Sequence, residues 1–232
     1  MPQRICPIVE GEIYHVFNRS VAGQPIFFNN KDYLRAFEVL KYYSFIKPGL
    51  RFSHYNRLPI NEKTKFLDEL VNNHDKQIDL LSYCLMPNHF HFLIKEINKN
   101  GISTLMRNFQ DSYAKYLNIK KKRHGALFQS MFKAVRIEND EQLNHVCRYI
   151  HLNPYMSFVV NSKADLEKYP WSSFPEYLEI INTGIINKNL IKNYYSSINE
   201  FKAYTYNEVE YRRMLKEFEY YYLDETNGFR NK

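Results

Sequence analysis

The chain has 232 residues, of which 44% are hydrophobic and 25% are charged, a balance typical of a folded globular protein. It contains no run of about 18 or more apolar residues, so no membrane-spanning helix is predicted. The N-terminus lacks the apolar segment of a signal peptide, and we therefore expect a cytoplasmic protein with no membrane association. The three cysteines, Cys6, Cys84 and Cys147, are odd in number and widely spaced, which argues against a disulfide framework or a structural zinc site.

Positive charge and aromatic side chains are both abundant. The chain has 32 Lys and Arg against 25 Asp and Glu, a formal net charge of +7, together with 20 Tyr and 17 Phe. This composition suits single-stranded nucleic acid, because cations neutralise phosphates and aromatic rings stack on unpaired bases. A Lys- and Tyr-rich sequence from an AT-rich genome would have the same composition, so composition alone leaves the partner open.

The N-terminal part of the chain predicts a strand and then helices. The strand covers residues 13–17, and a helix begins in the segment 29–32 and ends at Pro48-Gly49. A second, short helix is expected within residues 60–77, where apolar side chains recur in a polar stretch.

The central part predicts two adjacent strands and then alternating helices and strands. In chain order these are strands 78–85 and 89–95, an amphipathic helix over 102–117, a strand over 132–137, and a helix that begins at 139–141. The last helix is expected to end at Asn153, because the residue before Pro154 is disfavoured in the helical conformation.

The order strand, helix, strand, strand, helix, strand, helix predicts an α+β fold. It fits a ferredoxin-like antiparallel sheet with helices packed on one face. Residues beyond about 178 carry no chemical motif, and a helix is expected over Asn199–Tyr222. We therefore expect a catalytic or binding domain at residues 1–178 and a mostly helical C-terminal extension at residues 179–232.

A His-x-His pair occupies the third predicted strand. Side chains two apart in a strand point to the same face, so His89 and His91 project together, about 7 Å apart along the strand. Two imidazoles so placed can reach one divalent cation. A pair of surface or half-buried histidines that binds nothing explains the same spacing, so this motif alone is weak.

The last predicted helix carries a second candidate group. Tyr149 and Asn153 are four residues apart and therefore share a helix face, at the edge of the apolar stripe. From there the tyrosine could reach the sheet face that carries the histidine pair, and the Asn153 amide oxygen could bind the same metal. A core tyrosine and a helix-ending asparagine would give the same pattern.

A basic loop and scattered cations form the third group. Phosphate contacts are expected from the loop Lys120, Lys121, Lys122 and Arg123, which lies beside aromatic residues. Asn18, Arg19 and Lys133 are placed near the sheet face on weaker grounds. A solvated run of charge accounts for the loop equally well.

Four motifs in one order resemble a known family. The chain resembles the REP-associated tyrosine transposases, which belong to the single-tyrosine HUH nucleases. The motifs that carry the resemblance are, in order, the His-x-His pair at MPNH, then GALFQ, RYIHLNP and YPWSSF. The resemblance covers about residues 9–178 and implies a ferredoxin-like or RRM-like catalytic domain. It implies an enzyme that acts on single-stranded or hairpin DNA with Mg²⁺ or Mn²⁺. It does not decide between a monomer and a homodimer.

The resemblance also implies roles for individual residues. His89 and His91 match the paired metal ligands, Tyr149 matches the nucleophile, and Asn153 holds the position of the third ligand. Trp171, Ser172 and Ser173 match a signature that looks structural. Met131 stands where the family often has an arginine, so one phosphate contact is not expected.

The mechanism implied is attack of the Tyr149 hydroxyl on a scissile phosphate, which gives a 5′-phosphotyrosine and a free 3′-OH. A phenol has an ordinary pKa near ~10 and needs activation, from the metal first and from a nearby lysine or His151 to a lesser extent. Three alternatives stay open. One is a protein that binds hairpin nucleic acid without cutting it, and another is a metal-dependent phosphodiesterase or RNase that uses water as the nucleophile. The third is a domesticated enzyme that nicks DNA but no longer moves an element.

Overall fold

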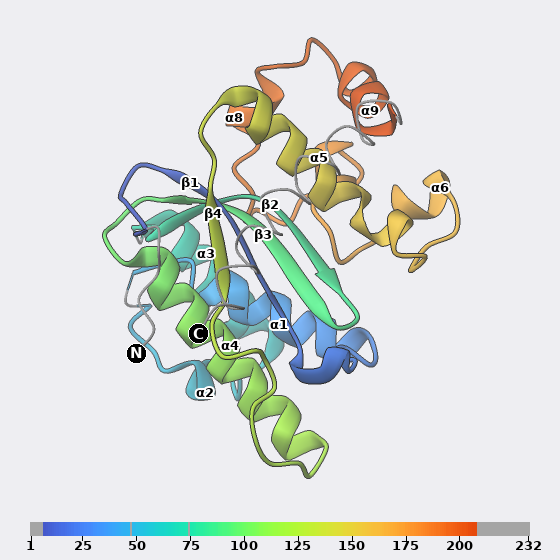
Figure 1. The fold of residues 1–232 in the computed structure, drawn as a ribbon. Coiled ribbons are helices and arrows are strands. Elements are labelled where there is room, and N and C mark those ends of the chain that lie inside the picture. The colour runs from blue at the N-terminus through green and yellow to red at the C-terminus, as the bar shows by residue number, and fades with distance from the viewer. Residues whose placement is uncertain (1–6, 47, 74, 208–232) are drawn as a thin grey trace, which may run out of the picture.

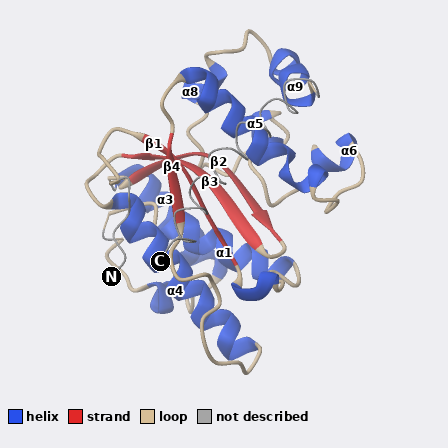
Figure 2. Ribbon diagram, in the orientation of Figure 1, coloured by secondary structure: helices blue, strands red, loops and turns tan. Residues whose placement is uncertain are grey.

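The computed structural model describes residues 7–46, 48–73 and 75–207, which form an antiparallel sheet with helices on both faces (Figures 1 and 2). The elements of the described residues are, in chain order, β1 (Ile13–Arg19), η1 (Val21–Gly23), α1 (Asn30–Tyr42), α2 (Phe52–Tyr55), α3 (Ile60–Asn73), β2 (Ile78–Met86), β3 (His89–Glu96), α4 (Gly101–Lys120), β4 (Lys133–Arg136), α5 (Asp140–Met156), α6 (Lys163–Leu166), α7 (Phe174–Tyr177), α8 (Asn189–Lys192) and α9 (Ile198–Tyr206).

The sheet has the strand order β2-β3-β1-β4, and every neighbouring pair is antiparallel. The connection from β1 to β2 contains η1, α1, α2 and α3, and β3 lies between these two strands in the sheet. Helix α4 connects β3 to β4, which forms the edge opposite β2. This is the ferredoxin-like arrangement, so the predicted α+β class with an antiparallel sheet is confirmed.

One face of the sheet is covered by α1 and α4. Alternate strand residues such as Val16, Phe90 and Phe92 enter a core with Leu40 of α1 and Phe109 of α4, and each of these five side chains is fully buried. The two-residue period of a strand separates this apolar face from the face that carries the histidines. The helices expected on one face are therefore present there.

The opposite face is partly covered by α5, so the sheet has helices on both sides rather than on one. Leu81 and Leu93 of the strands pack with Val146 and Ile150 of α5 in a second buried cluster. The physical reason is that the middle of the central strand β3 is apolar on both faces, with Phe92 and Ile94 on one side and Leu93 on the other. Such a strand needs cover on each side. Figure 2 shows α5 lying along the sheet, apart from α1 and α4.

Helix α5 begins as expected and ends later than expected. The Asn139 side chain accepts a hydrogen bond from the Gln142 backbone N–H at 2.8 Å, which caps the first turn. The helix does not end at Asn153 but continues through Pro154 to Met156. Pro154 is buried in the last turn, where burial offsets the loss of a single backbone hydrogen bond. As a result, Asn153 stays a full turn beyond Tyr149 on the same helix.

The Trp-Ser-Ser segment has a structural role at the edge strand β2. The Ser173 backbone N–H donates to Tyr83 O at 2.9 Å, and the Leu85 N–H donates to Trp171 O at 2.8 Å. The Trp171 ring stacks on Tyr33 of α1, with ring centroids 4.8 Å apart. The segment thus covers backbone groups that an edge strand would otherwise leave open.

The chain after residue 178 packs against α5 and β2. Asn187 N–H donates to Leu80 O at 2.9 Å, and Ile191 and Phe201 join the second buried cluster. The helix expected over Asn199–Tyr222 is present as α9 up to Tyr206, and its remainder from residue 208 onward lies outside the described residues. Over the described ranges, no helix combines the length and apolar character needed to cross a bilayer.

Candidate active site

Strand register brings the candidate residues together on one face. Arg19 pairs with His89 and Phe17 pairs with His91 across β1 and β3, and Phe17 also pairs with Lys133 of β4. Residues that pair directly across strands share a face, so three adjacent strands present these side chains to the same side. Strand alternation placed His89 and His91 on one face from the sequence, and the register adds which side chains of β1 and β4 lie beside them.

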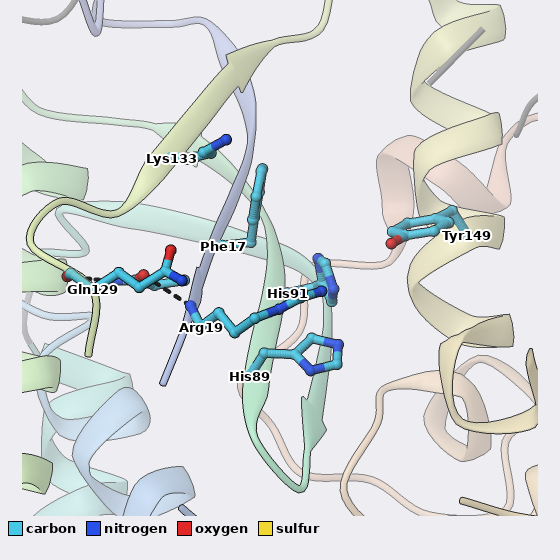
Figure 3. A pocket seen from close by; sticks show the side chains of 8 residues that line it. Phe17, Arg19, His89, His91, Gln129, Lys133 and Tyr149 are labelled. Atoms are coloured by element: carbon cyan, nitrogen blue, oxygen red, sulfur yellow. Dashed lines mark hydrogen bonds between the residues drawn. The ribbon is translucent and has the colours of Figure 1, made fainter. Parts of the chain in front are cut away.

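These side chains line a pocket of about 300 Å³ between the sheet and α5 (Figure 3). Its lining residues are Phe17, Asn18, Arg19, His89, His91, Gln129, Lys133 and Tyr149. Figure 3 shows the Tyr149 hydroxyl pointing from α5 toward the sheet, and the Arg19 side chain reaching toward the histidine rings. The histidine pair, the tyrosine and two predicted phosphate contacts, Arg19 and Lys133, therefore meet in one pocket.

The histidine pair is held so that one ring nitrogen of each side chain is already engaged. His89 Nδ1 donates to Asn88 Oδ1 at 2.6 Å, and His91 Nδ1 lies 3.0 Å from His15 Nε2. The rings of His89 and His91 are 5.0 Å apart between centroids and nearly perpendicular, at 89°. The Nε2 atom of each ring remains as the coordination position for a metal.

Both imidazoles are neutral at physiological pH. Burial is the main cause that lowers the pKa of His89 to about 4, and the Arg19 charge lowers it further while the nearby Asn153 side chain opposes the shift. Burial, then the neighbouring His15, His89 and Arg19, hold the pKa of His91 well below its ordinary value of 6.5. A neutral imidazole keeps the lone pair that a metal ligand requires.

Tyr149 is half-buried and lies against the histidines. Its ring meets that of His91 edge-on at 5.3 Å between centroids, and that of His15 at 5.8 Å. Burial raises the pKa of the phenol above 10, whereas Asn153 and the Arg19 charge act to lower it. At neutral pH the hydroxyl is therefore protonated, and Arg19, whose charge favours the ionised form, lines the same pocket.

Asn153 is buried beside His89 and Tyr149, one turn of α5 beyond the tyrosine. Its oxygen accepts a hydrogen bond from Ser157 Oγ at 3.4 Å, and its buried amide nitrogen has no hydrogen-bond partner among the described residues. A buried polar atom without a partner is unfavourable by about 1–3 kcal/mol unless a bound group satisfies it or the amide turns. Asn153 is not among the residues that line the pocket, but its side chain lies against His89 and Tyr149 and affects the pKa of each. Because an amide nitrogen only donates, it is the Asn153 oxygen that could reach a cation held by the imidazoles.

The donor set fits a divalent cation with an open coordination shell. Within the described ranges no group of three or more His, Cys, Asp or Glu side chains could hold a metal. Two imidazoles and one amide leave several positions for water and for phosphate oxygens. Imidazole donors favour a first-row cation such as Mn²⁺ over Mg²⁺ at equal concentration.

The basic loop lies apart from this pocket, because none of its four cations is among the lining residues. Lys120 forms an ion pair with Asp32, whose side chain is fully buried, so its charge is already compensated. The Lys121 ammonium lies 3.8 Å from the centroid of the Phe28 ring, and Arg123 donates to Ala126 O at 3.2 Å. Lys122 is exposed to solvent.

His151 does not belong to the pocket. Its Nε2 lies 2.8 Å from Ser173 Oγ, its Nδ1 lies 3.8 Å from Cys147 Sγ, and its ring packs against Phe174 and Tyr177. The expected assistance to Tyr149 is therefore not supported, because α5 turns residues 149 and 151 to different sides.

Three residues of the site were not predicted: His15 beside His91, and Phe17 and Gln129 in the pocket lining. One signal was available for two of them. His15 and Phe17 alternate with Arg19, which the sequence placed near the same face, so the strand period assigns all three to it. Gln129 lies in a loop, where no period applies.

Comparison with known proteins supports the family that the motifs indicated. Residues 56–153 match the family model described as "Transposase IS200 like", and this segment contains the histidine pair, Tyr149 and Asn153. A curated cysteine–tRNA ligase of Acholeplasma laidlawii (strain PG-8A) is 27% identical over 124 residues. That match covers 50% of this chain but 26% of the ligase, so the chain spans about a quarter of that relative's length.

The fold is also that of a solved transposase. The structure of a REP-associated tyrosine transposase bound to a REP hairpin has a TM-score of 0.52 with this chain and covers 81% of it, with 90% of the solved chain covered. The sequence identity is 13%, so the likeness concerns the fold. The four motifs thus indicated a transposase family, and the IS200-like transposase model matches residues 56–153 of this chain. The fold of the chain is similar to that of a REP-associated tyrosine transposase.

Proposed function

We propose that the chain is a metal-dependent tyrosine DNA transposase or endonuclease that cleaves and rejoins single-stranded DNA near hairpins. The observation that carries the proposal is that Tyr149 lines the same pocket as His89 and His91 although α5 and β3 are far apart in sequence. The solved neighbour is bound to a REP hairpin, which supports hairpin DNA as the substrate class. Residues 1–178 would form the catalytic domain and residues 179–232 its extension.

His89, His91 and Asn153 would hold the divalent cation, Mg²⁺ or Mn²⁺. When bound, the cation supplies positive charge beside a non-bridging oxygen of the scissile phosphate. Tyr149 Oη attacks phosphorus, and the new O–P bond replaces the bond to the 3′ oxygen. The phenol proton passes to solvent, and the leaving 3′ oxygen takes up a proton from solvent. The products are a 5′-phosphotyrosine and a free 3′-OH, and attack by another 3′-OH reverses the step and joins two strands.

The remaining lining residues bind and orient the strand. Arg19 and Lys133 supply the charge that neutralises the phosphates flanking the cut, and Phe17 offers a ring face to an unpaired base. Lys121, Lys122 and Arg123 would contact the DNA farther from the cut, and Lys120 would contribute less because Asp32 holds it. All of the proposed catalytic side chains come from one chain, so a homodimer would not be needed to complete the site.

The test is incubation with labelled single-stranded hairpin DNA, with and without Mn²⁺, followed by a denaturing gel. We expect a covalent protein–DNA band with the wild-type protein and Mn²⁺, and none with Tyr149→Phe or with His89→Ala. Tyr155→Phe, a tyrosine change on the same helix outside the pocket lining, should leave the band unchanged. DNA cleaved by Tyr149→Phe at the wild-type rate would favour water as nucleophile, and binding without cleavage would favour a hairpin-binding protein.

A further inference from the structure

His15 on β1 is fully buried and contacts both His91 of the sheet and Tyr149 of α5. Its Nε2 lies 3.0 Å from His91 Nδ1, and the two rings stack with centroids 5.1 Å apart and planes inclined by 24°. The Tyr149 ring meets it edge-on at 5.8 Å. Its neighbours along the strand, Tyr14 and Val16, point to the other face into an apolar core.

The contact with His91 explains why a polar residue is tolerated at this position. A fully buried imidazole loses its hydration, and the loss is unfavourable unless the ring finds a hydrogen-bond partner. Two neutral imidazoles joined by one hydrogen bond have complementary tautomers, because one ring donates the N–H and the other accepts it. His15 therefore constrains which nitrogen of His91 carries the proton.

We propose that His15 is a positioning residue that accepts the Nδ1 proton of His91 and so directs the His91 Nε2 lone pair into the pocket, toward the metal. The proposal rests on the proposed function, because it concerns a cation held by His89 and His91. Asn88 does the same for His89, whose Nδ1 donates to the Asn88 oxygen at 2.6 Å. Each ligand of the pair thus has an outer partner of its own, one on the neighbouring strand and one in the preceding turn.

The first measurement needs no variant. Long-range ¹H–¹⁵N correlation spectra of the metal-free protein report the tautomer of each histidine ring. We expect His91 to carry its proton on Nδ1, with an unprotonated Nε2. A His91 ring protonated on Nε2 would overturn the inference, whatever the protein's activity.

The second measurement is Mn²⁺ binding, followed as free Mn²⁺ by electron paramagnetic resonance. His15→Phe keeps a ring of similar size but removes the acceptor, and we expect it to weaken Mn²⁺ binding about 10- to 100-fold. His15→Gln restores an acceptor and should recover most of the affinity. His151→Phe is the matched control, since His151 is equally buried and bonded through Nε2 but lies outside the pocket.

The two proposals fail in different ways. Wild-type protein that shows no Mn²⁺ binding dependent on His89 and His91 would contradict the proposed function, and the inference with it. Wild-type binding that His15→Phe leaves unchanged would overturn only the role of His15. If His15→Phe does not fold, as judged by circular dichroism, the Mn²⁺ affinity of His15→Gln and the tautomer of His91 in the wild-type protein still test the role of His15.

Discussion

At the scale of single residues, burial and a nearby positive charge have opposite effects on the pKa of Tyr149 in the pocket. Burial raises the pKa of Tyr149, and the Arg19 guanidinium acts in the opposite direction. Figure 3 shows Arg19 reaching from β1 toward the histidine rings, on the side to which the phenol points. The same charge helps keep the His89 and His91 rings neutral. The Arg19 guanidinium thus favours both the ionised form of Tyr149, the proposed nucleophile, and the unprotonated form of the proposed metal ligands.

Replacing Arg19 with glutamine should therefore slow adduct formation about 10²- to 10³-fold, as expected when one donor to a developing charge is lost. Without the positive charge the pKa of Tyr149 rises, so the rise of the rate with pH should shift to higher pH. Single-turnover adduct formation measured across pH gives both results. Arg19→Lys keeps the charge and should keep the position of the profile, and an Arg19→Gln profile that coincides with wild type would contradict this role.

At the scale of elements, a buried ion pair joins α4 to the start of α1. Asp32 accepts hydrogen bonds from Lys120, from the Tyr116 hydroxyl at 2.7 Å and from the Phe28 N–H at 3.1 Å. Burial acts to raise the pKa of Asp32, but these hydrogen bonds outweigh it and lower the pKa below its ordinary value. Removal of Lys120 would leave a buried carboxylate without its cation.

Lys120→Met should accordingly destabilise the fold by about 1–3 kcal/mol at pH 7, measured by urea unfolding. Because the folded-state pKa of Asp32 is lowered, its stabilisation is present above the unfolded value and is lost as pH falls through the folded value. The difference between Lys120→Met and wild type should therefore shrink in acid. Lys122→Met is the control, with weaker DNA binding and unchanged stability, and equal stability of both variants at pH 7 would count against the ion pair.

The elements also show what the sequence could and could not predict. Periodicity and turn residues predicted the helices and strands of the sheet, because these signals are local. The predicted end of α5 at Asn153 was wrong, because burial of Pro154 outweighed the tendency of the residue before a proline to leave the helical conformation. The period of β1 could have placed His15 on the face of Arg19, but its contact with His91 depends on the register between β1 and β3. That register is fixed by packing between residues more than seventy positions apart, which no local signal gives.

At the scale of the whole molecule, four histidine side chains of the described residues are buried in the neutral form. Burial lowers the pKa of His15 and of His151 to about 3 and that of His89 to about 4, and it holds that of His91 well below 6.5. Each of these rings would take up a proton near its ordinary pKa once the chain unfolds. Acid should therefore favour the unfolded state well before carboxylates titrate.

The free energy of unfolding, measured with urea in the presence of a chelator, should be constant above about pH 7 and fall as the pH drops from 6.5 toward 4. Each histidine contributes up to about 1.4 kcal/mol per pH unit, because the unfolded state binds one more proton in this window. His151→Gln should show a smaller slope than wild type. A free energy that does not change between pH 7.5 and pH 5 would contradict the neutral, buried state of these rings.

The central claim is that Tyr149 becomes covalently joined to DNA in a pocket that it shares with His89 and His91. Mass spectrometry of the digested protein, after reaction with hairpin DNA and Mn²⁺ and removal of excess nucleotides by nuclease, locates the bond most directly. We predict a nucleotide-bearing phosphate on the peptide that contains Tyr149, and on no other tyrosine peptide. Cleaved DNA with an unmodified Tyr149 peptide, or a modification on a different tyrosine, would contradict the account.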